Sequence, residues 1–118
     1  MNLNYFTLSE FDSPDLPNSG VNMDGEFLAK LDNARAIAGI PFRITSGYRS
    51  KEHNEQFGGV PNSSHLIGVA ADIAVNSGHD RYIILNALIR AGFKRIGVAK
   101  TFIHCDTDDS KPNSVWTY

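Results

Sequence analysis

The stretch from Asn62 to Asp72 constrains this chain more than any other, because it holds two candidate metal ligands. His65 and Asp72 are a nitrogen and an oxygen ligand separated by six small or apolar residues. A second pair, His104 and Asp106, lies in the last third of the chain. Zinc binds neutral imidazole and carboxylate, and a catalytic zinc site uses three protein ligands and leaves one position open. The chain is therefore expected to fold around a zinc ion.

The surroundings of the candidate ligands support a metal more than isolated structural roles. Residues 69–75 are rich in small and β-branched side chains, which predicts a buried strand that carries Asp72. A buried carboxylate without a cation or strong donors is costly in free energy. On a strand, His104 and Asp106 point to the same face, while Cys105 points into the core as a small hydrophobe.

Composition limits the domain organisation and the classes of partner. A chain of 118 residues with 42% hydrophobic residues can bury one core but not two, so residues 1–118 are expected to form a single domain and a monomer. A net charge of -2 without a basic cluster argues against nucleic acid or an anionic membrane as partner. No apolar run is long enough to predict a transmembrane helix.

The N-terminal sequence gives an expectation about the compartment, whereas the cysteine content does not. The first ten residues have neither a basic start nor an apolar run followed by small residues, as a secretory signal would. The chain is therefore expected to be cytoplasmic as synthesised, unless another factor releases it. Cys105 is the single cysteine, which excludes an internal disulfide framework.

The hydrophobic pattern predicts an α+β domain with a small, mostly antiparallel sheet flanked by helices. One helix is expected after a cap at Asn22 or Asp24 and should end at Gly39. A second is expected to open at residue 77 or 78, end near Gly92 and use an apolar face made of Tyr82, Leu85, Leu88 and Ile89. The remaining expected elements are a helical turn at 50–57 and strands at 42–46, 69–75, 95–99, 101–106 and 115–118.

Arg49 is the candidate substrate-binding cation. It follows Ser46, Gly47 and Tyr48 at the end of a predicted strand, where a side chain can overhang a cleft. An isolated Arg49 would most simply form a salt bridge at the surface. Beside a zinc ion, however, a guanidinium can bind a substrate carboxylate or stabilise a developing oxyanion. His53 and His79 lie in polar stretches and are expected to be exposed to solvent.

Three ordered motifs resemble those of one family. Residues 63–72 read Ser-Ser-His-Leu-Ile-Gly-Val-Ala-Ala-Asp, which resembles the Ser-x-His-x-x-Gly-x-Ala-x-Asp signature of the zinc D-Ala-D-Ala carboxypeptidases. That family also contains bacteriophage endolysins and D-Ala-D-Ala dipeptidases. Residues 46–50, Ser-Gly-Tyr-Arg-Ser, and residues 102–106, Phe-Ile-His-Cys-Asp, fall in the order and spacing of the family. The resemblance extends from about Phe6 to Tyr118.

The resemblance implies a zinc peptidase that cleaves the stem peptides of peptidoglycan. It implies that His65, Asp72 and His104 hold one zinc ion, which activates a water molecule as the nucleophile. Arg49 matches the family arginine that binds substrate and stabilises the tetrahedral intermediate, and Ser63 matches a serine that lines the substrate site. Carboxypeptidase action on the terminal D-Ala-D-Ala bond is placed ahead of endopeptidase action. The small size fits a phage lysis protein that acts on the cell wall after release. The alternative is a bacterial dipeptidase of the cytosol.

The chain departs from the family pattern at Thr101. Many members carry a Glu or Asp general base at this position, three residues before the last histidine ligand. Asp106 is the replacement candidate because it shares a strand face with His104. The alternative is that Asp106 orients a ligand histidine, which is a frequent arrangement in zinc sites. Both roles remain open from the sequence.

The departure at Thr101 keeps a different class of function open. Residues 102–106 also resemble the corresponding segment of the hedgehog signalling domain, which shares the zinc fold and serves as a binding module. A zinc-containing binding module without turnover is therefore the alternative. The presence of both Arg49 and Ser63 favours the enzyme. A purely structural zinc site ranks last, since such sites usually fill all four positions with Cys and His.

Overall fold

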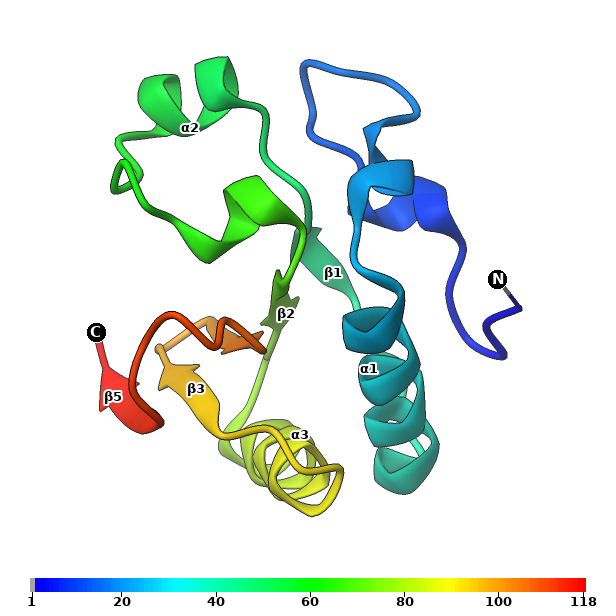
Figure 1. Ribbon diagram of the computed structural model, residues 1–118. Helices are drawn as coiled ribbons and strands as arrows, with labels where there is room; N and C mark the ends of the chain where they lie inside the picture. Colours follow the sequence, from blue (N-terminus) through cyan, green and yellow to red (C-terminus); the bar gives the residue numbers. More distant parts are fainter. Residues whose placement is uncertain (1) are drawn as a thin grey trace.

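The structure is a computed structural model that describes residues 2–118, and it has the expected α+β class (Figure 1). The α-helices are α1 (Gly25–Ala38), α2 (Lys51–Phe57) and α3 (Gly78–Arg90). Three short 3-10 helices are η1 (Leu8–Phe11), η2 (Ser19–Asn22) and η3 (Ser64–Ile67). The strands are β1 (Ile44–Ser46), β2 (Ala70–Ala74), β3 (Arg95–Val98), β4 (Phe102–Asp106) and β5 (Ser114–Thr117).

The strands form one five-stranded sheet in the order β1-β2-β4-β3-β5. The first four strands pair antiparallel, and β5 pairs parallel to β3 at the edge of the sheet. β4 is therefore central, between β2 and β3, although it is the fourth strand along the chain. The two strands that carry the candidate ligands Asp72 and His104 become direct neighbours in this order.

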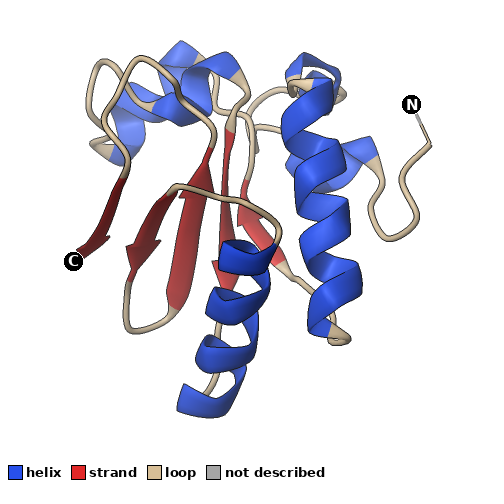
Figure 2. Cartoon of the chain, turned by 60° about the horizontal axis from the view of Figure 1, so that its bottom comes forward, coloured by secondary structure: helices blue, strands red, loops and turns tan. Residues whose placement is uncertain are grey.

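The two long helices begin and end where the sequence predicted. The Asp24 carboxylate accepts a hydrogen bond from the Phe27 backbone N–H (2.9 Å) and caps α1, and Gly39 ends this helix with φ +71°. Ser77 caps α3 by accepting from the Asp80 backbone N–H at 3.1 Å. Figure 2 shows α1 and α3 in one layer in front of the strands.

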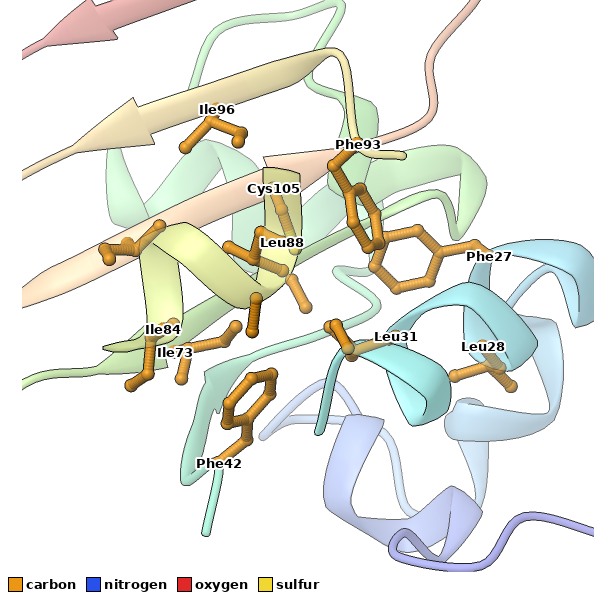
Figure 3. Close-up of a cluster of buried hydrophobic side chains, with 14 of the residues drawn as sticks. Phe27, Leu28, Leu31, Phe42, Ile73, Ile84, Leu88, Phe93, Ile96 and Cys105 are labelled. Atoms are coloured by element: carbon orange, nitrogen blue, oxygen red, sulfur yellow. The ribbon is translucent and has the colours of Figure 1, made fainter. Parts of the chain in front are cut away.

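The hydrophobic core fills the space between the sheet and this layer of helices. Side chains on a strand alternate between its two faces, and the alternate residues Ile73, Ile103 and Cys105 are fully buried. Ile73 and Cys105 meet Leu31 of α1 and Leu88 of α3, as the close-up in Figure 3 shows, and Ile103 belongs to the same cluster. The prediction that Cys105 points into the core is confirmed. Asp72, His104 and Asp106 therefore belong to the opposite face.

The predicted apolar face of α3 is partly wrong. Tyr82 and Ile89 are exposed, whereas Ile84 and Ala87 are buried together with Leu88. The face that meets α1 is therefore rotated from the expected one, because packing against neighbouring elements decides which side of a helix is covered. Among residues 2–118 we find no helix with the length and apolar character needed to cross a membrane.

Candidate metal centre

The open face of the sheet carries a single row of residues that crosses all five strands. The register pairs Ser46 with Asp72, Asp72 with His104, His104 with Gly97, and Gly97 with Trp116. Directly opposed residues on neighbouring strands have Cβ atoms about 4.5–5.5 Å apart. The sheet therefore places two of the three candidate ligands side by side.

The third candidate ligand, His65, is delivered by η3 and not by the sheet. The Ser63 hydroxyl accepts from the His65 backbone N–H (3.3 Å), and Gly68 ends the turn with φ +74°. A Cβ at Gly68 would lie 2.3 Å from the Asn22 carbonyl oxygen, so this position requires glycine for both its backbone conformation and its space. The tight turn returns the chain to β2 within a few residues and leaves His65 above it.

His65, Asp72 and His104 converge as a possible metal-binding triad. Each offers one donor atom, and these atoms all lie within 4.8 Å of one another. His65 Nε2 lies 3.4 Å and His104 Nδ1 2.9 Å from Asp72 Oδ1. All three side chains are almost fully buried. The structure therefore brings together the ligand set predicted from the sequence.

The outer nitrogens of both imidazoles are already occupied, which suits the triad for a metal. His65 Nδ1 donates to the Gly47 carbonyl oxygen (2.8 Å), and His104 Nε2 donates to Asp106 Oδ2 (2.7 Å). In the neutral imidazoles these contacts leave the lone pairs on His65 Nε2 and His104 Nδ1, the two nitrogens that face Asp72. This arrangement of ligand and supporting oxygen is common in zinc proteins, so the residues fit a zinc ion.

The electrostatics of the triad also favour a cation. Burial alone would raise the pKa of Asp72, but hydrogen bonds with His104 and His65 outweigh burial and hold this pKa well below its usual range. Burial would lower the pKa of His104, yet the Asp106 and Asp72 carboxylates together raise it. The two carboxylates therefore stabilise positive charge beside them, either as a proton on His104 or as a cation that displaces this proton from Nδ1.

Asp106 lies on the side of His104 that faces away from Asp72. Besides the bond to His104, its Oδ1 accepts from Arg95 Nε (2.7 Å) and from the Asp108 backbone N–H (3.1 Å). Burial alone would raise the pKa of Asp106, but the hydrogen bonds from His104 and Asp108 lower it. Both carboxylate oxygens are thus engaged with donors, and these contacts favour the orienting role over that of a general base.

Arg49 reaches the triad from the end of β1. Its Nη2 lies 3.6 Å from Asp72 Oδ2, and its Nε donates to Ser46 Oγ at 3.1 Å. The guanidinium lies 5.0 Å from the centroid of the Phe57 ring, in a cation–π contact. Burial lowers the pKa of Arg49, while the charge of Asp72 acts in the opposite direction. Arg49 is therefore held rigidly beside the triad, with part of its planar group available to a ligand.

The triad lies in a cavity of about 660 Å³ that all six candidate site residues line. Ser63, Arg49 and Asp106 are among the lining residues, together with the three candidate ligands. Thr101 is exposed, outside that lining, and its carbonyl oxygen accepts from the Val75 backbone N–H (2.9 Å). Position 101, where the family pattern predicts an acid, therefore has no carboxylate here, and its described contact is a backbone hydrogen bond.

The cavity also contains residues that the sequence did not single out. Trp116 and Tyr118 line it, and so do Phe57 and His53 of α2. His53 is half-buried and stacks on Phe57 (5.8 Å between centroids), so its predicted full exposure was wrong. Alternation along the predicted strand at 115–118 could have placed Trp116 and Tyr118 on one face. The pairing of that strand with β3 was the missing information.

Comparison with known protein families identifies a match for most of the chain. A family model described as Peptidase M15 matches residues 4–106 of this chain. The matched range contains the three candidate ligands and also Arg49, Ser63 and Asp106, while β5 lies outside it. A search of curated proteins finds no match.

Proposed function

The chain belongs to the Peptidase M15 family, the zinc D-Ala-D-Ala carboxypeptidases, and on that premise we propose that it hydrolyses peptidoglycan stem peptides with a zinc ion. The family is zinc-dependent and acts on substrates of peptidoglycan type. The observation that carries the proposal is the buried triad of His65, Asp72 and His104, whose facing nitrogens and carboxylate converge in a cavity. We propose these three residues as the zinc ligands.

When bound, zinc supplies a Lewis acid that polarises a carbonyl and lowers the pKa of water from about 15.7 toward roughly 7. The protein's own contribution begins with Arg49. Its side chain is partly buried, held by Ser46 and adjacent to Asp72, so the guanidinium can bind the terminal carboxylate of a stem peptide or the oxyanion that forms during hydrolysis. Ser63 lines the same cavity and can contact the peptide backbone.

Asp106 has an orienting role in this proposal. A carboxylate that accepts from His104, Arg95 and the Asp108 backbone holds the imidazole in one plane and one tautomer. A general base needs a free oxygen that reaches the proton it takes. The contacts of Asp106 support the first role better than the second.

The alternative function is a binding module that holds zinc but does not turn over substrate. One observation favours it: four carboxylates line the cavity, and each accepts hydrogen bonds from the protein. Glu10 accepts from the Thr7 backbone N–H, and Asp12 accepts from the Asn18 and Gly20 backbones. Asp72 and Asp106 are engaged as described above. Asp72 and Asp106, the two carboxylates that contact His104, are therefore both held by other groups, which disfavours proton transfer by either of them.

A hydrolysis assay tests the proposal. Zinc-loaded protein is incubated with intact peptidoglycan and with a synthetic stem pentapeptide that ends in D-Ala-D-Ala, and products are identified by mass. We expect metal-dependent cleavage that a chelator abolishes. Release of a single D-Ala would identify a carboxypeptidase, and internal cleavage an endopeptidase.

Two matched variants sharpen the assay. Arg49→Lys keeps the charge but loses the planar fork, and we expect it to lose most of the activity while it retains zinc. His79→Ala removes an exposed histidine of α3 and should behave like the wild type. A wild-type protein with one zinc per chain and no cleavage of either substrate would contradict the peptidase and favour the binding module. Activity on peptidoglycan would also be consistent with a phage lysis protein.

A further inference from the structure

The last strand contributes to the metal centre although it lies beyond the matched family region. β5 covers residues 114–117, while the match ends at residue 106. β5 pairs parallel to β3 and thereby brings Trp116 into the row that contains His104 and Asp72. Trp116 lines the same cavity as the triad. An edge strand is therefore part of the site and is more than a closing element of the sheet.

Gly97 allows the indole of Trp116 to reach His104. These two residues flank Gly97 in the register, one on each side. A Cβ at Gly97 would lie 2.5 Å from Nε1 and 2.7 Å from Cε2 of Trp116, closer than real side chains approach. The indole therefore lies across the backbone of β3, and its ring centroid is 5.4 Å from that of His104. A side chain at position 97 would separate the two rings.

Trp116 also belongs to a closed set of four side chains around Gly97. The Arg95 guanidinium lies 4.9 Å from the centroid of the indole. Arg95 pairs with Asp106 (2.7 Å), and Asp106 accepts from His104 Nε2 (2.7 Å). His104 in turn packs against the indole. Each member thus contacts two others, so a shift of Trp116 is transmitted to His104 both directly and through Arg95 and Asp106.

We infer that Trp116 is a positioning residue that fixes the ring plane of His104 and thereby sets the affinity for the metal ion. A single hydrogen bond at Nε2 lets an imidazole swing about that bond, whereas an indole packed against the imidazole, here at an interplanar angle of 48°, opposes the swing. Zinc–nitrogen bonds are short, about 2.0–2.1 Å, so a small rotation of the ring weakens coordination. The inference rests on the proposed zinc site, but it does not require that the protein cleaves a peptide.

Zinc affinity of variants at position 116 tests the inference without any substrate. Trp116→Phe keeps a flat ring, and Trp116→Leu keeps apolar volume on β5 but loses the flat ring. Val115→Ala is the matched control, because Val115 is the neighbouring residue of β5 and is exposed. In competition with a chelator, we expect Trp116→Leu to bind zinc about tenfold more weakly, at the lower end of effects seen for residues that support metal ligands. Trp116→Phe and Val115→Ala should stay within about threefold of the wild type, which is below that range.

A spectroscopic readout keeps the test valid if a variant at position 116 fails to fold. Trp116 is the only tryptophan, so tryptophan emission, excited selectively over that of the four tyrosines, reports the surroundings of Trp116 alone. We expect Co²⁺ bound at the triad to quench this emission in the wild type. Gly97→Ala retains the indole but forces it away from His104, so it should weaken zinc binding and shift the emission together.

The possible outcomes separate the inference from the proposed function. Equal zinc affinity in the wild type, Trp116→Leu and Gly97→Ala would overturn the positioning role while leaving the zinc site intact. Equal weakening by Val115→Ala and Trp116→Leu would also overturn it, because the effect would then come from the packing of β5 in general. A wild type that binds no zinc would refute the zinc site and this inference with it.

Discussion

The two candidate histidine ligands are held in different ways. His65 belongs to a short turn, and its Nδ1 donates to a backbone carbonyl, that of Gly47. His104 belongs to the central strand, and its Nε2 donates to a side chain, that of Asp106. The two residues therefore present opposite nitrogens to the same point, Nε2 from His65 and Nδ1 from His104.

This difference teaches where each ligand is vulnerable. The support of His65 comes from the course of the main chain, so no side-chain truncation can delete it. The support of His104 comes from side chains on neighbouring strands, and each of them can be replaced. A ligand fixed by the backbone is specified by a local motif, whereas a ligand fixed by side chains depends on the register of the whole sheet.

Removal of either histidine ligand should have the largest effect on zinc binding, and the effect should be similar for the two histidines. We expect His65→Ala and His104→Ala each to weaken zinc binding by about a thousandfold or more, since zinc sites bind with roughly 10–16 kcal/mol shared among their ligands. Zinc content after dialysis measures the loss, with His79→Ala as the control. Full zinc retention in both ligand variants would refute the assignment of the ligands.

Gly47→Ala should disturb the backbone support of His65. A Cβ at Gly47 would lie 2.6 Å from Cα and 2.8 Å from Cβ of Phe11, and Phe11 is fully buried and cannot yield. We expect a loss of about 1–3 kcal/mol in the free energy of unfolding of the metal-free protein, as for other overpacked sites. Denaturant titration measures this loss.

Gly78→Ala is the control for that substitution, because its new Cβ would meet only the end of Arg81 at 3.9 Å. It should be neutral or slightly stabilising, since alanine favours a helix more than glycine does. Equal stability of Gly47→Ala and the wild type would show that the main chain at this position adapts. The backbone would then hold His65 less rigidly than the contrast with His104 implies.

Asp106→Asn should disturb the side-chain support of His104. An amide offers one acceptor and one donor, whereas Asp106 accepts from His104 on one oxygen and from Arg95 on the other. One of these donors therefore loses its acceptor. We expect zinc affinity to fall about 10- to 100-fold, the range found for residues that support metal ligands.

Asp109→Asn is the control, since Asp109 is exposed and close in sequence. Unchanged zinc affinity with a large loss of turnover would instead make Asp106 the general base. The two roles that the sequence left open are thus separated by one variant and two measurements.

The sequence predicted the secondary structure well where caps and breakers mark the ends. Asp24 and Gly39 bound α1 as expected, and Ser77 caps α3. The buried face of α3 was partly wrong because several sides of this helix carry apolar residues. Ile84 is buried and Ile89 is exposed, although each is an isoleucine in the same helix. The positions of α1 and of the sheet decide between them, and that information is not local.

For the candidate site as well, the sequence predicted the residues that stand in local motifs and missed the one that depends on strand pairing. His65 and Asp72 stand in one motif, and His104 stands in a strand whose alternation could be read directly. Trp116 was missed because its role depends on two facts that no local pattern carries. β5 pairs with β3, which precedes β4 in the chain, and Gly97 leaves room for the indole.

The smallest predicted effect concerns the connection between the two ligand-bearing segments. Asp108, two residues beyond β4, accepts a hydrogen bond from the Ser64 hydroxyl (2.6 Å), next to His65 in sequence. The Lys111 ammonium lies 3.4 Å from the same carboxylate and donates to Ser64 Oγ at 3.0 Å. This contact joins the backbone-held turn to the strand that carries His104.

The pH dependence of stability tests this connection. Burial alone would raise the pKa of Asp108, but hydrogen bonds from Ser110 and Ser64 lower it to about 2. The folded pKa thus lies below the unfolded value of about 3.9, so the ionised carboxylate stabilises the fold above about pH 4 and this contribution is lost as the pH falls toward 2. We expect Asp108→Asn to cost about 1–2 kcal/mol in the free energy of unfolding at pH 7.

The difference between Asp108→Asn and the wild type should shrink as the pH falls from about 4 to 2, because protonation removes the same charge from the wild type. Denaturant titrations of the metal-free proteins across this range measure it, with Asp109→Asn as the control. A constant difference at all pH values would mean that the shape of the side chain matters and its charge does not. The turn that carries His65 and the strand that carries His104 would then be joined by packing and not by the charge of Asp108. The two histidines would in that case differ in how each is held but would not be coupled by an ionised group.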